Sequence, residues 1–163
     1  MAATTHVLGG WIESAGGPLL MLPLSARTAW KGVWSGDYRE ACAVKDRLES
    51  LVRPWGDVLV LGDEPMRTGV LFRPDGPCLI RWRYAPDEAC MIEVALETDV
   101  DRLVPVESLM FDVKDEPYAI IDSGDDGGRA EVLEFKPPAG QRLVRTYEIQ
   151  DDAKQVALLL HRF

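Results

Sequence analysis

Short apolar runs, separated by turns rich in glycine and proline, divide most of this sequence into segments of strand length. The stretch WIESAGGPLLMLP, residues 11–23, is the first example, with Ala15-Gly16-Gly17-Pro18 between two such runs. Runs of this length bounded by turn residues are typical of β-strands, and alternation within them indicates a half-buried face. The strands we expect are 11–14, 19–22, 58–61, 68–73, 78–84, 90–97, 118–122, 131–136, 141–149 and 154–163, a helix beginning at Asp152 being the alternative for the last.

One segment has a helical period. Asp37 is placed as an N-cap, and apolar residues or long side chains then recur at steps of three and four. They are Tyr38, Ala41, Cys42, Lys45, Leu48 and Leu51. This pattern predicts one amphipathic helix near residues 37–50, ended by Pro54. The fold class we expect is therefore mostly β (α+β), with an antiparallel sheet or a partly closed barrel and one helix.

The 163 residues are enough to bury a sizeable core, and no repeat, linker or change of composition marks a boundary. We therefore expect a single domain over 1–163. The N-terminal residues lack the basic and apolar regions of a signal peptide, and no tract is apolar enough to span a bilayer. Three cysteines cannot all pair within the chain, which favours free thiols in a reducing cytoplasm.

Negative charge is concentrated in one part of the chain. Of the 27 acidic residues, thirteen lie in 87–126, where the only basic residues are Arg102 and Lys114. The negative electrostatic potential of such a segment repels nucleic-acid phosphates and anionic membranes and attracts basic partners. We therefore expect no nucleic-acid or membrane partner, and the candidate contacts for a basic protein are Asp99, Asp101, Asp112, Asp115, Glu116, Asp122, Asp125 and Asp126.

Ser14 is the candidate nucleophile of the opening stretch. A nucleophile elbow needs glycine two residues before the serine, and Ile12 occupies that position. The chain offers only His6 and His161 as a histidine base, one near each end. We favour a structural bend between two strands, and a small hydrolase using Ser14 or an acidic pair stays as the alternative.

The acidic stretch DSGDDGG has part of a calcium-loop pattern. With Asp122 at position one, Asp126 falls at position five and Gly127 at the glycine position six. The bidentate glutamate of position twelve is replaced by Leu133. The histidines and cysteines also lack the close spacing of zinc ligands. We therefore predict a solvated hairpin loop, no metal site and no cofactor.

Five tryptophans allow two interpretations. Packing in the core explains them most simply, whereas an exposed tryptophan would be a typical anchor of a protein interface. They are Trp11, Trp30, Trp34, Trp55 and Trp82.

Four stretches give the chain a resemblance to a known family. They are WIESAGGPLLMLP, AWKGVWSGDYREAC, VLVLGDEPMRTGVLF and LIRWRY, all within residues 11–84. Together they resemble immunity protein family 21 of bacterial polymorphic toxin systems. The matching residues are Trp11, Ser14, Gly16, Gly17, Pro18 and Leu19, then Trp30, Gly32, Asp37, Tyr38 and Cys42, then Leu61, Gly62, Asp63, Glu64 and Pro65, and finally Trp82.

The resemblance implies a small, mostly β, cytoplasmic protein that binds and neutralises a cognate toxin domain, with no catalysis and no cofactor. From about residue 87 no motif matches, so the resemblance assigns no interface residue there. The acidic surface is compatible with a basic, nuclease-type toxin. A β-type module that binds a small ligand or regulates another protein is the remaining alternative, and the sequence leaves the toxin and the oligomeric state open.

Overall fold

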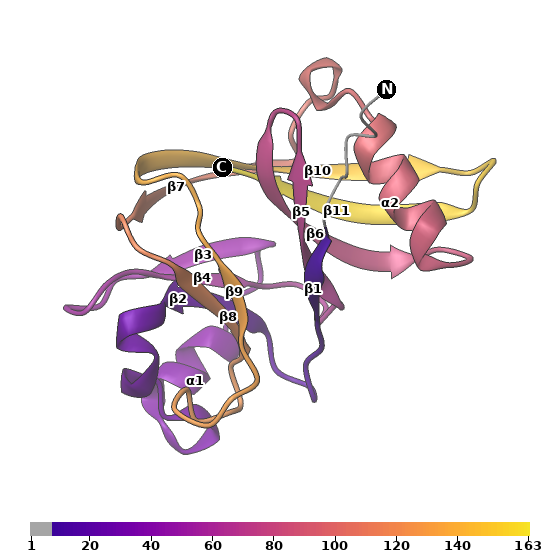
Figure 1. Cartoon of the computed structure of the whole chain (residues 1–163). Helices are drawn as coiled ribbons and strands as arrows, with labels where there is room; N and C mark the ends of the chain where they lie inside the picture. Colours follow the sequence, from indigo (N-terminus) through magenta and orange to yellow (C-terminus); the bar gives the residue numbers. More distant parts are fainter. Residues whose placement is uncertain (1–7) are drawn as a thin grey trace.

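Residues 8–163, which a computed structural model of the chain describes, form two antiparallel sheets that lie face to face (Figure 1). The larger sheet has six strands in the order β1-β5-β6-β11-β10-β7. Their bounds are β1 Leu8–Ile12, β5 Thr68–Arg73, β6 Gly76–Tyr84, β11 Val156–Arg162, β10 Gly140–Asp151 and β7 Glu107–Val113.

The smaller sheet has five strands in the order β3-β4-β2-β8-β9. Their bounds are β3 Leu48–Leu51, β4 Val58–Leu61, β2 Leu19–Pro23, β8 Tyr118–Asp122 and β9 Leu133–Phe135. Short connections therefore carry the chain from one sheet to the other: it passes from β1 to β2 through residues 13–18, and from β7 to β8 through residues 114–117.

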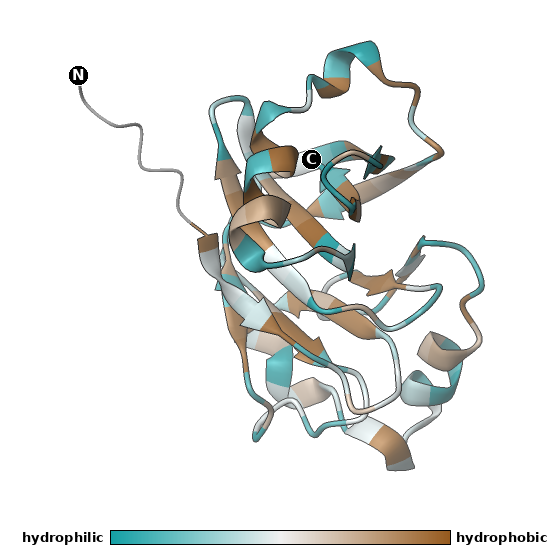
Figure 2. Cartoon of the chain, turned by 90° about the vertical axis from the view of Figure 1, so that its right-hand side faces the viewer, coloured by the Kyte–Doolittle hydropathy of each residue, from teal (hydrophilic) through white to brown (hydrophobic). Residues whose placement is uncertain are grey.

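Strands β2 and β4 of the smaller sheet are apolar along their whole length because both of their faces are covered. In β2, Leu19 and Met21 face the core between the two sheets, while Leu20 and Leu22 face an outer layer of helices. All five residues of β2 are buried. Such strands show continuous apolar runs, whereas strands with one wet face alternate. Figure 2 shows hydrophobic residues along the strands of both sheets.

Helical segments cover the outer faces. The 3₁₀ helices η1 (Leu24–Ala29) and η2 (Gly32–Trp34) and the short helix α1 (Gly36–Cys42) lie over the smaller sheet. Helix α2 (Glu88–Glu97), which is followed by the 3₁₀ helix η3 (Val100–Arg102), packs against the larger sheet. The molecule therefore has four layers, with one large core between the sheets and a smaller core under each helical layer.

The sheets do not close into a barrel, so that part of the expected fold class is corrected. Edge strand β7 contacts edge strand β3, and edge strand β1 contacts β9. Within residues 8–163, however, no ladder of hydrogen bonds joins the two sheets. The mostly β, antiparallel class is confirmed, as a sandwich.

The helix predicted near 37–50 is about half as long as expected. It ends at Cys42, and residues 48–51 form β3, which pairs with β4. Leu48 faces the core between the sheets and Leu51 the outer layer, a two-sided arrangement that a strand provides. Cys42, expected on a buried helix face, is exposed.

The strand predicted over 90–97 is wrong, because this segment belongs to α2. Asp87 caps the helix: its Oδ1 accepts from Cys90 N–H at 2.8 Å. Met91, Val94 and Ala95 are buried at helical spacing against the larger sheet. The other expected strands are present with shifted ends, 154–163 is a strand rather than a helix, and β3 and β7 were not predicted.

Candidate functional site

Three loops that are distant in sequence meet at one end of the smaller sheet. They are the turn between β1 and β2, the segment from η2 into α1, and the loop that follows β8. We refer to residues 14–18, 31–38 and 122–126 together as the three-loop surface. Several of the motif residues that carry the family resemblance lie in its first two loops, and three of the eight acidic candidates lie in its third.

The Ser14 side chain is used inside its own turn. Its hydroxyl donates to the carbonyl of Gly17, and its Oγ accepts from the amide of Gly16 at 3.0 Å. His161, the candidate base within the described residues, is fully buried in the larger sheet, where Nδ1 lies 2.8 Å from Thr146 Oγ1. Burial lowers its pKa well below the ordinary value. His6, the other candidate base, lies outside the described residues.

Asp122 ties the first loop to the third. Its Oδ2 accepts from the amide of Ala15 at 2.8 Å, and its Oδ1 accepts from the amide of Gly124 at 2.9 Å. The residue is buried. This candidate contact residue is therefore engaged in holding the two loops together, as is typical of a buried carboxylate with its oxygens satisfied.

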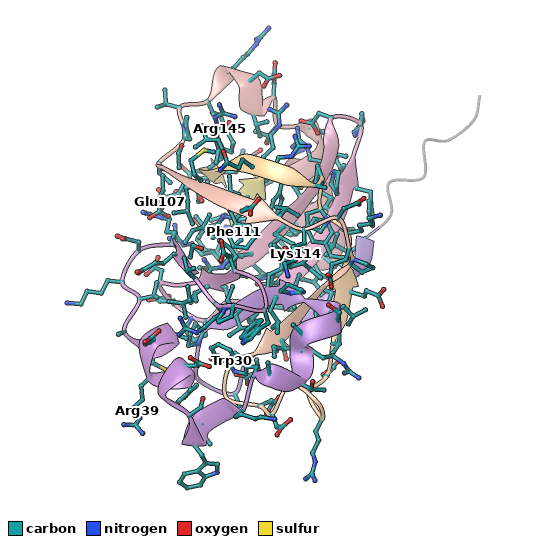
Figure 3. The ribbon with its side chains drawn as sticks, turned by 90° about the vertical axis from the view of Figure 1, so that its left-hand side faces the viewer. Trp30, Arg39, Glu107, Phe111, Lys114 and Arg145 are labelled. Atoms are coloured by element: carbon teal, nitrogen blue, oxygen red, sulfur yellow. The ribbon has the colours of Figure 1, made fainter. Side chains whose placement is uncertain are left out.

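The second loop is fixed to the third by Trp30 and by the main chain around Gly32. The indole N–H of Trp30 donates to the Ser123 carbonyl at 2.8 Å, and the amide of Val33 donates to the Gly124 carbonyl at 3.2 Å. Gly32 has φ +76°, and a Cβ there would lie 2.7 Å from that Gly124 oxygen, so the close approach requires glycine. Figure 3 shows Trp30 inside this end of the molecule.

Trp34 is presented to solvent on this fixed turn. Its side chain is 92% exposed, and the neighbouring Val33 is 45% exposed. Ser35 follows directly, with its amide and its hydroxyl both bonded to the Gly32 carbonyl, at 3.0 and 2.7 Å, and its Oγ accepts from the Tyr38 amide at the start of α1. An indole on a rigid, hydrogen-bonded support is pre-organised for an interface.

A hollow of about 240 Å³ lies between the three loops. Among residues 8–163, the charged residues that line it are Asp122 and Asp125, and the aromatic one is Tyr38. The pKa of Asp125 is raised mainly by partial burial and, to a smaller extent, by the negative charge of Asp122. A hydrogen bond with the Cys42 side chain raises the pKa of Tyr38. The complete lining is Ala15, Gly16, Gly17, Val33, Tyr38, Asp122, Gly124 and Asp125.

The remaining motif turn, Leu61–Pro65, is held from the other sheet. Arg81 of β6 is 1% exposed, and its Nη2 donates to the carbonyls of Gly62 at 2.6 Å and Glu64 at 3.0 Å. Burial lowers the pKa of Arg81 to about 10. The guanidinium therefore has a structural use, as a clamp on this turn.

Trp11 and Trp82, at the two ends of the resemblance, lie away from the three-loop surface and contact each other. Their rings are 5.6 Å apart, edge to face, and the Arg67 guanidinium lies 4.9 Å and 5.2 Å from the two ring centres. The Trp11 indole also donates to Glu88 of α2. This cluster attaches β1, β6 and α2 to one another and accounts for two of the five tryptophans by packing.

The eight acidic candidates do not form one patch. Asp99 and Asp101 lie at η3, paired with Arg102 at 3.2 Å and Arg162 at 2.7 Å. A second group lies on β7 and the β7–β8 turn: Asp112, which is exposed, Asp115, paired with Lys136 at 3.4 Å, and Glu116, which accepts from Ser25. The third group is Asp122, the last residue of β8, with Asp125 and Asp126 in the loop that follows.

Asp126 uses one oxygen to cap its own loop at the Gly128 amide, at 2.8 Å. Among residues 8–163 no group of three or more histidine, cysteine or carboxylate side chains is arranged to hold a metal ion. The helices of this part of the chain are all too short or too polar to cross a membrane.

Sequence reasoning missed two features of the site. Trp34 was one of five tryptophans with nothing local to distinguish it, and its exposure depends on the packing of η2. The approach of Ala15 to Asp122 joins residues 107 positions apart, which no local pattern reveals.

A protein-family model matches most of the chain. The family model described as immunity protein 21 matches residues 10–155, which extends well beyond residue 84, where the recognisable motifs end. No curated protein and no solved structure matches the chain.

Proposed function

Because the chain belongs to the immunity protein 21 family, whose role is toxin neutralisation, we propose that it binds a cognate toxin domain and blocks it without catalysis. The toxin-binding site in this proposal is the three-loop surface. Its chemistry is that of a contact surface, with one exposed indole, an acidic hollow and main-chain atoms tied in hydrogen bonds.

The exposure of Trp34 carries the proposal. At 92% it is the most exposed of the large hydrophobic side chains in residues 8–163, yet the turn beneath it is held by hydrogen bonds to the third loop. Tryptophan is enriched among the few residues that supply most of the binding energy of an interface. A rigid support also lowers the entropic cost of binding.

The environment of Ser14 supports the non-catalytic part. Its hydroxyl donates within its own turn, and the fully buried His161 is bonded to Thr146 of the neighbouring strand. A serine nucleophile needs a base within hydrogen-bond reach, and no described histidine occupies that position.

The charge distribution supports a basic toxin domain. The chain has a formal net charge of −9, and Asp125 and Asp126 are both exposed beside Trp34's loop. A negative surface accelerates the encounter with a cationic partner and opposes the approach of nucleic acid. We place this encounter in the cytoplasm, where the three free thiols would stay reduced.

The test uses the toxin domain that co-purifies with this protein from its native host, titrated with purified protein while its activity is followed. The expected result is inhibition that is complete at a fixed stoichiometry, and a Trp34→Ala variant whose Kd is raised about 30-fold or more. Val104→Ala is the matched control, because Val104 is 87% exposed on a different segment. Equal Kd values for Trp34→Ala and wild type would reject the three-loop surface as the toxin site.

A further inference from the structure

We propose that the hollow of the three-loop surface receives one cationic side chain, an arginine or a lysine, from the bound protein. This inference rests on the proposed function, because the cation is taken to belong to the toxin domain. It adds a defined chemical contact to the exposed indole of Trp34.

The charged groups of the hollow are both negative. Asp122 and Asp125 line it, and neither forms an ion pair with a lysine or arginine within residues 8–163. Asp122 has its two oxygens occupied by the amides of Ala15 and Gly124. The carboxylate of Asp125 is exposed and accepts no hydrogen bond within the same residues, so it is the group left to meet a cation.

The uncharged walls also suit a cation. Tyr38 lines the hollow, and an aromatic face attracts an ammonium or guanidinium group. Val33 and the glycines at 16 and 17 supply apolar and main-chain surface against which an aliphatic stem packs. A volume of about 240 Å³ is suited to one side chain rather than to a larger ligand.

A buried hydroxyl without a partner lies next to Gly17, one of the residues that line the hollow. Ser123 is fully buried, and its Oγ has no hydrogen-bond partner within the described residues. It faces the side of Gly17 that lacks a side chain: a Cβ there would lie 2.8 Å from this Oγ and 3.1 Å from the Tyr38 ring. Buried polar groups without partners are rare in proteins, and a small shift at Gly17 on occupation of the hollow would let a hydrogen-bonding ligand satisfy this hydroxyl.

The first experiment tests the hollow without the toxin. Backbone amide NMR follows the titration of the ¹⁵N-labelled protein with N-acetyl-arginine methylamide, and with the neutral citrulline analogue as a control. Saturable shifts of the amides of Ala15, Gly17 and Gly124 are expected with the arginine compound only. Asp125→Asn should remove these shifts, and Glu131→Gln should keep them, because Glu131 is exposed and lies outside the three-loop surface.

Equal shifts with the citrulline compound, or shifts that survive in Asp125→Asn, would overturn the inference. A loss of the shifts is not expected to come from misfolding, since the Asp125 side chain holds no other part of the described chain, and thermal unfolding checks this directly.

The second experiment separates this inference from the proposed function by using the toxin domain. Asp125→Asn should raise the Kd about 30-fold or more, mainly through faster dissociation, while Glu131→Gln, which removes a charge outside the three-loop surface, changes it only slightly. If Asp125→Asn binds like wild type and Trp34→Ala does not, the cation-binding hollow is rejected and the toxin site stands. If the arginine compound saturates the hollow while wild type does not inhibit the toxin, the proposed function is rejected and the hollow stands.

Discussion

The guanidinium of Arg81 donates a 2.6 Å hydrogen bond from Nη2 to the main-chain carbonyl of Gly62, across the interface between the two sheets. The same nitrogen bonds the Glu64 carbonyl at 3.0 Å. A turn of the smaller sheet is thus positioned by a side chain of the larger one. The conformation of this turn, in which Asp63 has φ +66°, therefore depends on the stacking of the sheets.

Arg81→Met should destabilise the fold by about 2 kcal/mol, because buried carbonyls of the turn lose their donor. Arg83→Met is the control: Arg83 is two residues along the same strand but is exposed, and its ion pairs with Glu148 and Asp63 lie at the surface. Urea unfolding measures both. Equal losses of stability in the two variants would contradict the conclusion that Arg81 holds the Leu61–Pro65 turn.

Gly32→Ala should lower the free energy of unfolding by about 1–3 kcal/mol, because alanine is strained at φ +76° and its Cβ would lie 2.7 Å from the Gly124 oxygen. Gly36→Ala is the matched control four residues later, where the φ is ordinary and the space around the Cβ is open. Thermal or urea unfolding compares the two. A Gly32→Ala protein as stable as Gly36→Ala would show that the two loops are not held as described.

Stability should fall as the pH is lowered below about 6.5, through His161. Burial lowers its pKa in the folded state, so the unfolded chain takes up a proton that the folded chain does not. The contribution is therefore complete above the unfolded pKa and is lost as the pH falls toward the folded pKa, by up to about 1.4 kcal/mol per pH unit.

Urea unfolding of wild type and His161→Gln between pH 7.5 and 5.5 measures this effect. The difference between the two proteins isolates the histidine from Glu107, whose pKa is raised by burial and which acts in the opposite direction. Parallel stability curves for the two proteins would mean that His161 takes up a proton as readily in the folded state as in the unfolded state.

If the acidic loop attracts a basic toxin, association should slow markedly between about 50 and 500 mM salt, as the Debye length falls from about 14 to about 4 Å. Reversal of Asp125 and Asp126 to lysine should lower the association rate at low salt. Reversal of Glu131 and Glu134, which are exposed and outside the three-loop surface, changes the net charge equally and should have a smaller effect. Stopped-flow binding across a salt series would reject attraction if both double variants matched wild type throughout.

Local patterns predicted most of the strands because a strand buried on both faces, such as β2 or β4, is a short apolar run bounded by turn residues. They failed at 90–97, where the sequence CMIEVALE alternates and also has apolar residues at helical spacing. The helix forms because Asp87 caps it and because Met91 and Val94 meet an apolar face of the larger sheet. That face is a property of the assembled fold, so the choice between the two periods is made outside the segment.

The helix prediction over 37–50 was partly wrong for a related reason: Leu48 continues a helical spacing by coincidence. The backbone of residues 48–51 instead forms hydrogen bonds with β4, the next strand along the chain. The site shows the same limit: the residue types around the opening turn were recognisable, but the contact between Ala15 and Asp122 that assembles the three loops is long-range.

The contact of each sheet's edge with an edge of the other, β7 with β3 and β1 with β9, also restricts how this protein can meet other chains. Exposed strand edges are templates for the addition of further strands, which leads to aggregation and domain swapping. Here each edge lies against an edge of the other sheet, which leaves less room for another chain to add a strand. This arrangement favours recognition of a partner through side chains and loops over recognition through an added strand.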